Sequence, residues 1–358
     1  MNGVQEACRL GRTSSIRHGG RKMVEGVNRQ WTLAARPVGF PKESDFKLVE
    51  SLVETPEKGE VLLKAEWLSL DPYMRGRMNS GSAGAPGVET GCVMPGGVGG
   101  RVVDSRAAGF SPGDYALAAT GWQEYGIALV SSLRKLDPAQ APLSTAVGVA
   151  GMPGLTAYFG ALDVCQPRPG DTFVVSAASG AVGAVAGQIA LMAGCKVVGV
   201  AGTDEKIDYI VDELGFDGGI NYKTQDVQTR LAEECPSGID CYFDNVGGAV
   251  TDAVLDNLAA GARVAICGQI SQYNLAAPEM GPRNLRSLLG NRARMQGFTV
   301  NNYAHRFPEG LARLTSWIRS GRLKYREHVV EGFEEMPRAF IGLLHGENFG
   351  KLLIKTAE

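Results

Sequence analysis

The sequence predicts an α/β protein built from a β-rich part and a doubly wound parallel sheet. Up to about residue 150, short apolar runs alternate with turns rich in Gly, Pro and Ser, which is typical of β-strands. After Gly170, strand-like and helix-like segments alternate along the chain. The 358 residues suit two domains of about 100–200 residues each. We expect 23–150 and 327–358 to form the β-rich domain, and 151–326 to form the parallel sheet.

The segment 1–22 stands apart from both predicted domains. It has no apolar periodicity, its only acid is Glu6, and its basic residues are Arg9, Arg12, Arg17, Arg21 and Lys22. Such a segment is predicted to be disordered. It is either a targeting leader or an artefact of a start site upstream of Met23, and the sequence leaves both alternatives open.

Individual elements follow from the spacing of apolar residues. In the β-rich part, strands are predicted at 60–68, 100–104, 115–118 and 123–130, and two late strands at 324–331 and 352–355 rejoin it. In the second part, six strands are predicted at 172–177, 196–201, 219–222, 239–244, 263–268 and 295–300. Helices are predicted between them at 181–193, 204–214, 226–234 and 249–257. The first two helices stop at Gly194 and Gly215, where a helix end favours glycine.

Composition excludes several classes of function. Lys and Arg number 36 against 38 Asp and Glu, so no excess of positive charge is present to bind a nucleic acid or an anionic membrane. The sequence lacks an uninterrupted apolar run of ~18 residues, so no membrane-spanning helix is expected. Seven cysteines lack the density of a secreted disulfide framework. We expect them to be reduced and the protein to be cytoplasmic.

A glycine turn follows the first strand of the second part. Residues 178–183 read ASGAVG, which is a variant of the dinucleotide fingerprint of the Rossmann fold, A-x-G-x-x-G, with alanine in place of the first glycine, and a helix comes next. Gly180 lets a pyrophosphate approach the backbone, and Gly183 lets the helix pack closely on the strand. A purely structural glycine turn is the alternative, but the order of strand, turn and helix favours cofactor binding.

The end of the second strand indicates which cofactor is used. An NAD site normally places Asp or Glu there to accept from the ribose 2′-OH, whereas this strand runs into Gly202. Lys206 and Tyr222 follow, and they offer a positive charge and a hydroxyl to a 2′-phosphate. The sequence therefore favours NADPH. In the alternative, Lys206 is a solvated helix residue paired with Asp204 or Glu205.

Metal ligands are scarce in the sequence. Its four histidines have no zinc-site spacing, and no closely spaced set of four cysteines occurs; the histidines are His18, His305, His328 and His345. No metal site is expected. Without a Lewis acid, oxidation of an alcohol is difficult, whereas hydride addition to an activated double bond needs no metal. Cys267, at the end of the fifth strand, is either a buried thiol or a cofactor contact.

Nine ordered motifs resemble one family. They are DPYMRGRM (71–78), GMPGLTAYFG (151–160), AASGAVGAVAGQIA (177–190), GTDEK (202–206), NYK (221–223), CYFDNVGG (241–248), CGQISQYN (267–274), GF (297–298) and NFGK (348–351). Together they look like the zinc-independent medium-chain reductases of the prostaglandin reductase and alkenal/one oxidoreductase group, which includes NADPH-dependent curcumin reductases. The similarity extends over about 28–355.

The resemblance implies a GroES-like β-rich domain, a homodimer and a set of cofactor contacts. Gly180, Ala181, Val182 and Gly183 would hold the pyrophosphate, Lys206 and Tyr222 the 2′-phosphate, and Asn245 the next section of NADPH. The nicotinamide half would be lined by Cys267, Gly268, Gln269, Ile270, Ser271, Gln272, Tyr273, Phe298, Thr299, Val300 and Asn348. Thr299 departs from the aliphatic residue that mammalian members carry there.

Two tyrosines match those that the family places around the substrate, Tyr73 and Tyr273. A tyrosine hydroxyl can donate to a carbonyl oxygen that gains charge as hydride arrives at the β-carbon. We expect Tyr273 to be this donor and Tyr73 to be a pocket wall or a second donor, although either ring could serve packing alone. Apolar surface for an extended substrate is expected from Trp122, Met74 and Tyr125.

The expected activity is therefore NADPH-dependent reduction of the carbon–carbon double bond of α,β-unsaturated ketones and aldehydes, by hydride transfer to the β-carbon. The partner is a small enone or alkenal. Two alternatives stay open at the level of sequence. One is a quinone reductase on the same fold, and the other is a protein that binds NADPH without catalysis.

Overall fold

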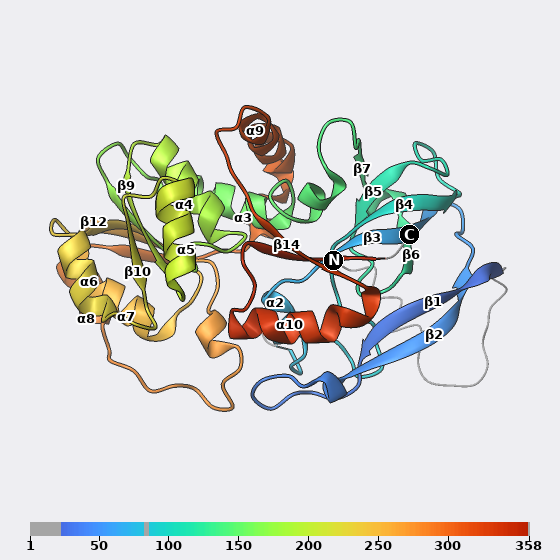
Figure 1. Cartoon of the computed structure of the whole chain (residues 1–358), viewed down its shortest axis with the longest axis horizontal. Coiled ribbons are helices and arrows are strands. Elements are labelled where there is room, and N and C mark those ends of the chain that lie inside the picture. The colour runs from blue at the N-terminus through green and yellow to red at the C-terminus, as the bar shows by residue number, and fades with distance from the viewer. Residues whose placement is uncertain (1–22, 82–85, 357–358) are drawn as a thin grey trace. The chain divides into compact units, whose positions relative to one another are not determined.

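The computed structural model describes residues 23–81 and 86–356 (Figure 1), so the predicted leader 1–22 lies outside the described residues. The chain divides into two compact units. The β-rich unit comprises the described residues up to Val147, then His328–Glu347 and the segment from Leu352 onward. The Rossmann unit comprises Gly148–Glu327 and Asn348–Lys351. The sequence-based division placed 348–351 with the β-rich part, whereas this short segment belongs to the Rossmann unit.

The β-rich unit contains a seven-stranded sheet and a separate two-stranded sheet. The larger sheet has the order β14-β15-β3-β4-β5-β7, with β6 also paired to β3. Its strands are β3 (Glu60–Ser69), β4 (Val98–Ser105), β5 (Tyr115–Ala118), β6 (Tyr125–Leu129), β7 (Arg134–Leu136), β14 (Glu327–Glu331) and β15 (Lys351–Lys355). Both predicted late strands thus rejoin this sheet. The two-stranded sheet, β1 (Met23–Leu33) with β2 (Phe46–Glu54), has no counterpart among the predicted elements.

The core of the β-rich unit is built around Trp122, which is fully buried. Its ring stacks on Phe46 at 5.5 Å and meets Phe340 edge-on at 5.5 Å between ring centroids. Phe340 belongs to α10 (Met336–His345), which the sequence did not predict. Met74 is also fully buried. Neither Trp122 nor Met74 therefore offers surface to a substrate, contrary to the expectation from sequence.

The Rossmann unit contains a six-stranded sheet with the order β10-β9-β8-β11-β12-β13, paired in parallel. All six predicted strands occur: β8 (Thr172–Ser176), β9 (Lys196–Ala201), β10 (Gly218–Asn221), β11 (Ile239–Asp244), β12 (Leu258–Ile266) and β13 (Arg294–Gly297). The predicted fold class is therefore confirmed. The strand order reverses between β8 and β11, and the crevice at the carboxyl ends of two such strands is where this fold binds ligands.

Helices flank this sheet, and in Figure 1 α4 and α5 lie next to each other while α6, α7 and α8 form a separate group. The helices are α3 (Met152–Phe159), α4 (Gly183–Met192), α5 (Asp204–Asp208), α6 (Val227–Glu234), α7 (Gly248–Asp256), α8 (Leu285–Gly290) and α9 (Phe307–Arg319). A π-helical segment, Tyr209–Glu213, continues α5. None of the helices in the described ranges is long and apolar enough to cross a membrane.

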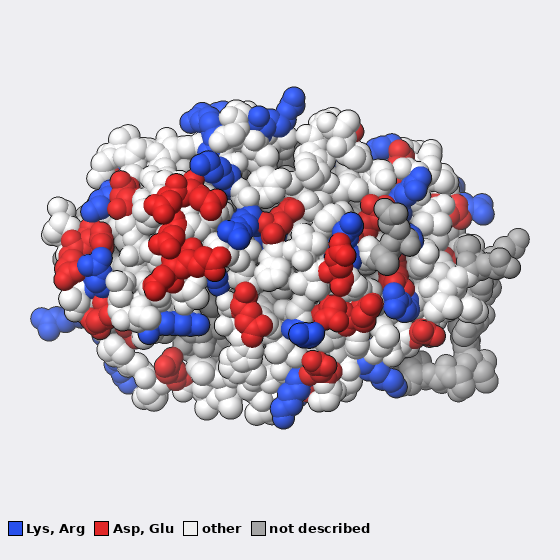
Figure 2. Space-filling model, in the orientation of Figure 1, with Lys and Arg blue, Asp and Glu red and all other residues white. Residues whose placement is uncertain are grey.

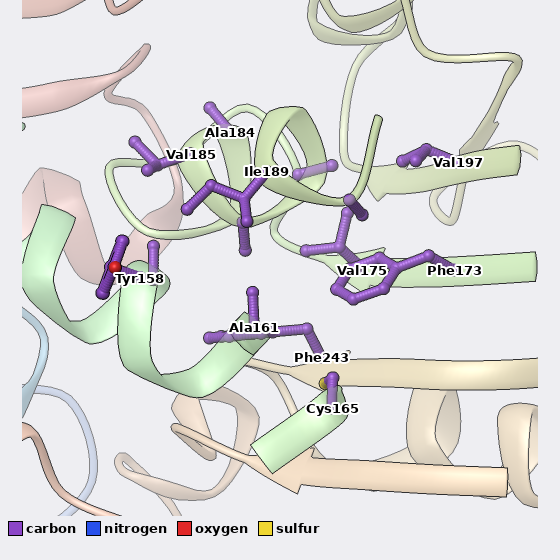
Figure 3. Close-up of a cluster of buried hydrophobic side chains, with 14 of the residues drawn as sticks. Tyr158, Ala161, Cys165, Phe173, Val175, Ala184, Val185, Ile189, Val197 and Phe243 are labelled. Atoms are coloured by element: carbon purple, nitrogen blue, oxygen red, sulfur yellow. The ribbon is translucent and has the colours of Figure 1, made fainter. Parts of the chain in front are cut away.

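Large side chains from the central strands form the core of the Rossmann unit (Figure 3). Phe173 and Phe243 are fully buried, and Ile189 of α4 packs over the strands. Small residues on α4 make this close packing possible, because a Cβ at Gly187 would lie 2.1 Å from the ring of Phe216. The charged surface is mixed, since basic and acidic side chains are interspersed on the face shown in Figure 2.

Candidate active site

The glycine turn leaves no room for side chains on its inner side. A Cβ at Gly183, where α4 begins, would lie 2.3 Å from the carbonyl oxygen of Ala177. At Gly180 the corresponding distance to the same oxygen is 3.1 Å. Ala177 itself has φ +50°, a left-handed conformation that costs a non-glycine residue about 1–2 kcal/mol. The turn is thus a tight, partly buried strand-to-helix corner whose main chain can approach a phosphate.

A small cavity borders this turn, and one of its lining residues is an arginine that the sequence did not mark as part of the site. It is lined in part by Ser179, Gly180, Ala181, Tyr209, Arg326 and Gly350. The guanidinium carbon of Arg326 lies 3.8 Å from the ring centroid of Phe349 and 5.7 Å from that of Tyr209. Arg326 is distant from the glycine turn in sequence, so only the fold places its charge there.

A second positive region lies at the ends of β9 and β10. Burial and the nearby charge of Lys223 lower the pKa of Lys206. Two lysines close enough to affect each other in this way are poised for an anion, because a bound phosphate relieves their repulsion. The ring of Tyr222 packs over Gly202, where a Cβ would lie 2.9 Å from the ring carbon Cε1. The predicted 2′-phosphate residues are therefore brought together.

The two alternative partners of Lys206, Asp204 and Glu205, have different surroundings. The carboxylate of Asp204 accepts a hydrogen bond from Asn221 Nδ2 at 2.6 Å, so it is engaged with the end of β10. Asn221 Oδ1 in turn accepts from the main-chain N–H of Lys223 at 3.1 Å. Glu205 raises the pKa of Lys206, although burial and Lys223 outweigh it. The local hydrogen bonds thus fix the turn that carries the lysines.

Asn245 lies at the reversal point of the sheet, directly after β11. Its Nδ2 donates to the carbonyl oxygen of Ser176 at 2.8 Å, and its main-chain N–H donates to Ser176 Oγ at 2.9 Å. These bonds tie the carboxyl ends of β8 and β11 together. Asn245 was predicted as a cofactor contact, and its position at this edge of the sheet suits that prediction.

The predicted nicotinamide-side segment 267–273 is hydrogen-bonded to the loop after β11. The main-chain N–H groups of Cys267 and Gly268 donate to the carbonyl oxygen of Asp244 at 2.9 and 3.0 Å. The N–H groups of Ile270 and Ser271 donate to Asn245 and Val246 at 3.3 and 3.0 Å. Burial, followed by the charge of Asp244, raises the pKa of Cys267 to about 12, so this thiol stays protonated.

Tyr273 ends this segment, and its hydroxyl is oriented by the main chain. The N–H of Gln269 donates to Tyr273 Oη at 3.2 Å. Burial raises the pKa of the Tyr273 hydroxyl. The phenol is therefore neutral at physiological pH, and because it accepts from Gln269, its own proton is available for donation to another acceptor.

Tyr73 belongs to the β-rich unit, where it begins the short helix α2 (Tyr73–Arg77). The side chain is 37% exposed. Desolvation and the charge of Asp71 raise the pKa of its hydroxyl. Tyr73 is thus a second neutral phenol, carried by the other unit.

The remaining predicted contacts have varied environments. Phe298 is 9% exposed, and its ring meets Phe243 edge-on at 6.1 Å in the core, so a contact with a ligand would involve its main chain. Thr299 is exposed and its N–H donates to Asn302 Oδ1 at 2.9 Å. Val300 packs against the core, and Asn348 Nδ2 donates to the carbonyl oxygen of Gly350 at 2.8 Å.

No group of three or more His, Cys, Asp or Glu side chains that could hold a metal ion occurs within residues 23–81 and 86–356. The free thiols are Cys165, Cys195, Cys235, Cys241 and Cys267.

Comparison with known proteins gives two family matches and several relatives of nearly full length. Residues 29–136 match the N-terminal domain of oxidoreductase, and 181–316 match the family described as zinc-binding dehydrogenase. The NADPH-dependent curcumin reductase of Escherichia coli is 46% identical over 92% of this chain and 97% of its own. Prostaglandin reductase 1 of Rattus norvegicus is 43% identical over 91% of this chain and 98% of its own.

A solved structure agrees with these matches. The crystal structure of CurA in complex with NADPH from Vibrio vulnificus has a TM-score of 0.88 and 47% sequence identity, and it covers 92% of this chain and 99% of that chain.

Proposed function

We propose that this chain, which belongs to the medium-chain dehydrogenase/reductase family of oxidoreductases, is an NADPH-dependent reductase of α,β-unsaturated ketones and aldehydes. One observation carries the chemical part of this proposal. The neutral hydroxyl of Tyr273 accepts from Gln269 and keeps its proton for an acceptor beside the reversal point of the sheet. A donor of this kind suits a carbonyl oxygen that becomes negatively charged.

The residues of the Rossmann unit fit NADPH. The turn at Gly180 and Gly183 would receive the pyrophosphate, since a Cβ at either position would crowd the backbone. Lys206, Tyr222 and Lys223 would hold the 2′-phosphate. NADPH supplies a hydride when it is bound. Segment 267–273, residues 298–300 and Asn348 would line its nicotinamide half, as the resemblance implies.

The protein's own contribution to catalysis follows from these positions. Tyr273 would donate its hydrogen bond to the substrate carbonyl oxygen, and this bond would strengthen as the oxygen gains charge. Tyr73, as the resemblance implies, stays a candidate for a pocket wall or a second donor. We therefore assign the cofactor and the donor Tyr273 to the Rossmann unit.

A substrate panel tests the proposed function. The full chain is assayed for NADPH consumption with a short alkenal, an aryl enone such as curcumin, an oxo-lipid enone and a simple quinone. We expect turnover with at least one enone or alkenal, and no oxidation of the matching saturated alcohol with NADP⁺. Turnover confined to the quinone, or tight NADPH binding without any turnover, would contradict the proposal.

Replacement of Lys206 by alanine should reduce the affinity for NADPH but not for NADH. A hydrogen bond to a charged group contributes about 1.5–3 kcal/mol, which corresponds to a roughly 10- to 100-fold change in Kd. NADH lacks the 2′-phosphate, so its Kd should change by less than about twofold. Fluorescence titration of both cofactors gives these constants.

Lys196→Ala is the matched control for this experiment, because Lys196 lies at the opposite end of β9 and donates to the Glu234 carbonyl oxygen at 2.6 Å. The pKa of Lys206 is lowered, so this lysine loses its proton at a lower pH than an ordinary lysine. NADPH affinity should therefore fall as the pH rises through that pKa, while NADH affinity should not. Equal losses for both cofactors in Lys206→Ala would remove this residue from phosphate recognition.

We also propose that two copies of the chain pair through β13. This strand ends the sheet, and it is bonded only to β12 within the described part of the chain. Exposed apolar side chains precede it in sequence, Leu289 at 82%, Leu285 at 68% and Met280 at 90% exposure. An unpaired edge strand flanked by apolar surface is a template for pairing with another copy.

Leu289→Asp tests this interface. We expect light scattering after size-exclusion chromatography to give a dimer for the unchanged chain and a larger monomer fraction for the variant, because a charge would be buried on pairing. Val38→Asp is the control, since Val38 is 84% exposed in the β-rich unit. A monomeric unchanged chain would refute the proposal.

The proposal places the protein in the cytoplasm. The five free thiols within residues 23–81 and 86–356 support a reducing compartment. Fractionation of cells that express the full chain would test this location, and recovery in an exported or membrane fraction would contradict it.

A further inference from the structure

The carboxylate of Asp244, at the carboxyl end of β11, is fully buried and surrounded by hydrogen-bond donors. Its Oδ1 accepts from Tyr242 Oη, Val246 N and Gly247 N, each at 2.9 Å, and from Ser176 Oγ at 3.3 Å. Its Oδ2 accepts from Thr251 Oγ1 at 2.7 Å and Gln269 Nε2 at 2.9 Å. A buried carboxylate is stable only when donors replace the lost water, and these donors come from the carboxyl ends of β8, β11 and β12 and from α7.

The bonds of Asp244 lead to Tyr273 by a short route. Gln269 donates its side-chain Nε2 to Asp244 and its main-chain N–H to Tyr273 Oη at 3.2 Å. The carbonyl oxygen of Val246, whose N–H is held by Asp244, accepts from both the N–H and the Oγ of Ser271 at 3.0 and 2.7 Å. Asp244 therefore restrains Gln269 directly and Ser271 through Val246, just before Tyr273.

The packing around Gln269 leaves little freedom for any other arrangement. Gly247 has φ +76°, and a Cβ there would lie 2.2 Å from Gln269 Oε1. The side-chain amide also donates to the Gly268 carbonyl oxygen at 3.1 Å. A change at Asp244 is thus transmitted to the main chain of Gln269 and to the hydroxyl that it orients.

We propose that Asp244 is a positioning residue for the reaction, which holds the Tyr273 hydroxyl in its donating orientation through Gln269. This inference rests on the proposed function, because it assigns Tyr273 the role of donor. Asp244 does not touch the substrate in this scheme. Its role is to fix the segment 267–273 against the loop after β11.

Asp244→Asn keeps the size of the side chain but turns one acceptor oxygen into an NH₂ group that faces the donors of Thr251 or Gln269. Misplacement of a catalytic group by about 1 Å can cost up to about 100-fold in rate, so we expect kcat to fall about 10- to 100-fold. The Kd for NADPH should change by less than threefold. The control is Asp240→Asn, on the same strand, whose carboxylate accepts from the main-chain N–H of Thr172 at 2.9 Å.

A double-mutant cycle with Tyr273→Phe separates positioning from a general structural role. If Asp244 acts through Tyr273, adding Asp244→Asn to the Tyr273→Phe enzyme should lower kcat by no more than about twofold. If Asp244→Asn lowers kcat of the Tyr273→Phe enzyme by the same factor as it lowers kcat of the otherwise unchanged chain, the inference is overturned. Gln269→Met replaces Asp244→Asn if the latter fails to fold, because it removes one donor and leaves the carboxylate five others.

Hydrogen exchange gives a readout that does not depend on activity. We expect Asp244→Asn to increase amide exchange in peptides that cover 267–273, while exchange in β8 stays unchanged. Unchanged exchange in 267–273 would overturn the positioning role even if activity fell. If Asp244→Asn speeds exchange in 267–273 but the unchanged chain reduces no enone, the positioning of this segment by Asp244 stands and the proposed function is rejected.

Discussion

Tyr273→Phe is expected to lower kcat for enone reduction by about 100-fold, because removal of one donor to a developing oxyanion typically costs 10²- to 10³-fold. The Kd for NADPH should change by less than about twofold, since the ring stays in place and only the hydroxyl is lost. The Gln269 N–H then loses its acceptor, but the bonds of the segment to Asn245 and Val246 persist. Steady-state kinetics with the best enone of the substrate panel and a fluorescence titration of NADPH measure both constants.

Tyr303→Phe is the matched control for this substitution. Its ring stacks on Phe159 at 4.7 Å between centroids in the same unit, so removal of its hydroxyl leaves that contact unchanged. We expect kcat within twofold of the unchanged chain. A Tyr273→Phe enzyme with an undiminished kcat would show that this hydroxyl is not the donor, and Tyr73→Phe would then be the variant to examine.

Gly183→Ala is expected to disrupt both folding stability and cofactor binding. The added Cβ would lie 2.3 Å from the Ala177 carbonyl oxygen and 3.1 Å from Ala178 Cα, and both are backbone atoms that cannot move aside cheaply. Overpacking of this kind typically costs 1–3 kcal/mol, so we expect the free energy of unfolding to fall by about 2–3 kcal/mol. Because the turn must shift, NADPH affinity should fall at least tenfold. Denaturant unfolding and NADPH titration provide the two measurements.

Gly290→Ala controls for the loss of a glycine in the same unit. A Cβ at Gly290 would meet no atom within 4 Å, and its φ is not positive. We expect its unfolding free energy and NADPH affinity to match those of the unchanged chain. Equal stability and affinity in Gly183→Ala would mean that the turn adapts, and the argument for a fixed phosphate-binding corner would fail.

Part of the site was predictable because its residues are close together in sequence. The glycine turn directly follows its strand, and the sequence shows directly that β9 runs into Gly202 without a carboxylate, shortly before Lys206. Such short patterns predict the backbone conformation of the segment in which they occur. The segment 267–273 was reached only through the resemblance, since no short-range pattern marks it as a wall of the site.

Other features depended on contacts between distant segments. The strand β2 is largely exposed, so it lacks the alternation of apolar residues that marks a half-buried strand. Trp122 and Met74 looked like ligand surface, but helix α10, from the end of the chain, helps to enclose the core that contains them. Arg326 is far from the glycine turn in sequence, and only the folded chain brings it to the cavity beside that turn, where the N–H of Lys351 donates to its carbonyl oxygen at 2.9 Å.

Asp244 illustrates the difference between what the sequence predicts locally and what the tertiary structure decides. By itself, the sequence determined the alternation of strands and helices, the glycine turn and the positive residues after β9, because each rests on spacing within one segment. Only the tertiary structure decided that a carboxylate within an apolar strand would meet donors from three strands' ends and one helix, and that it would thereby orient Tyr273. The physical reason is that the energy of a buried charge depends on the groups around it, and the fold alone brings those groups together.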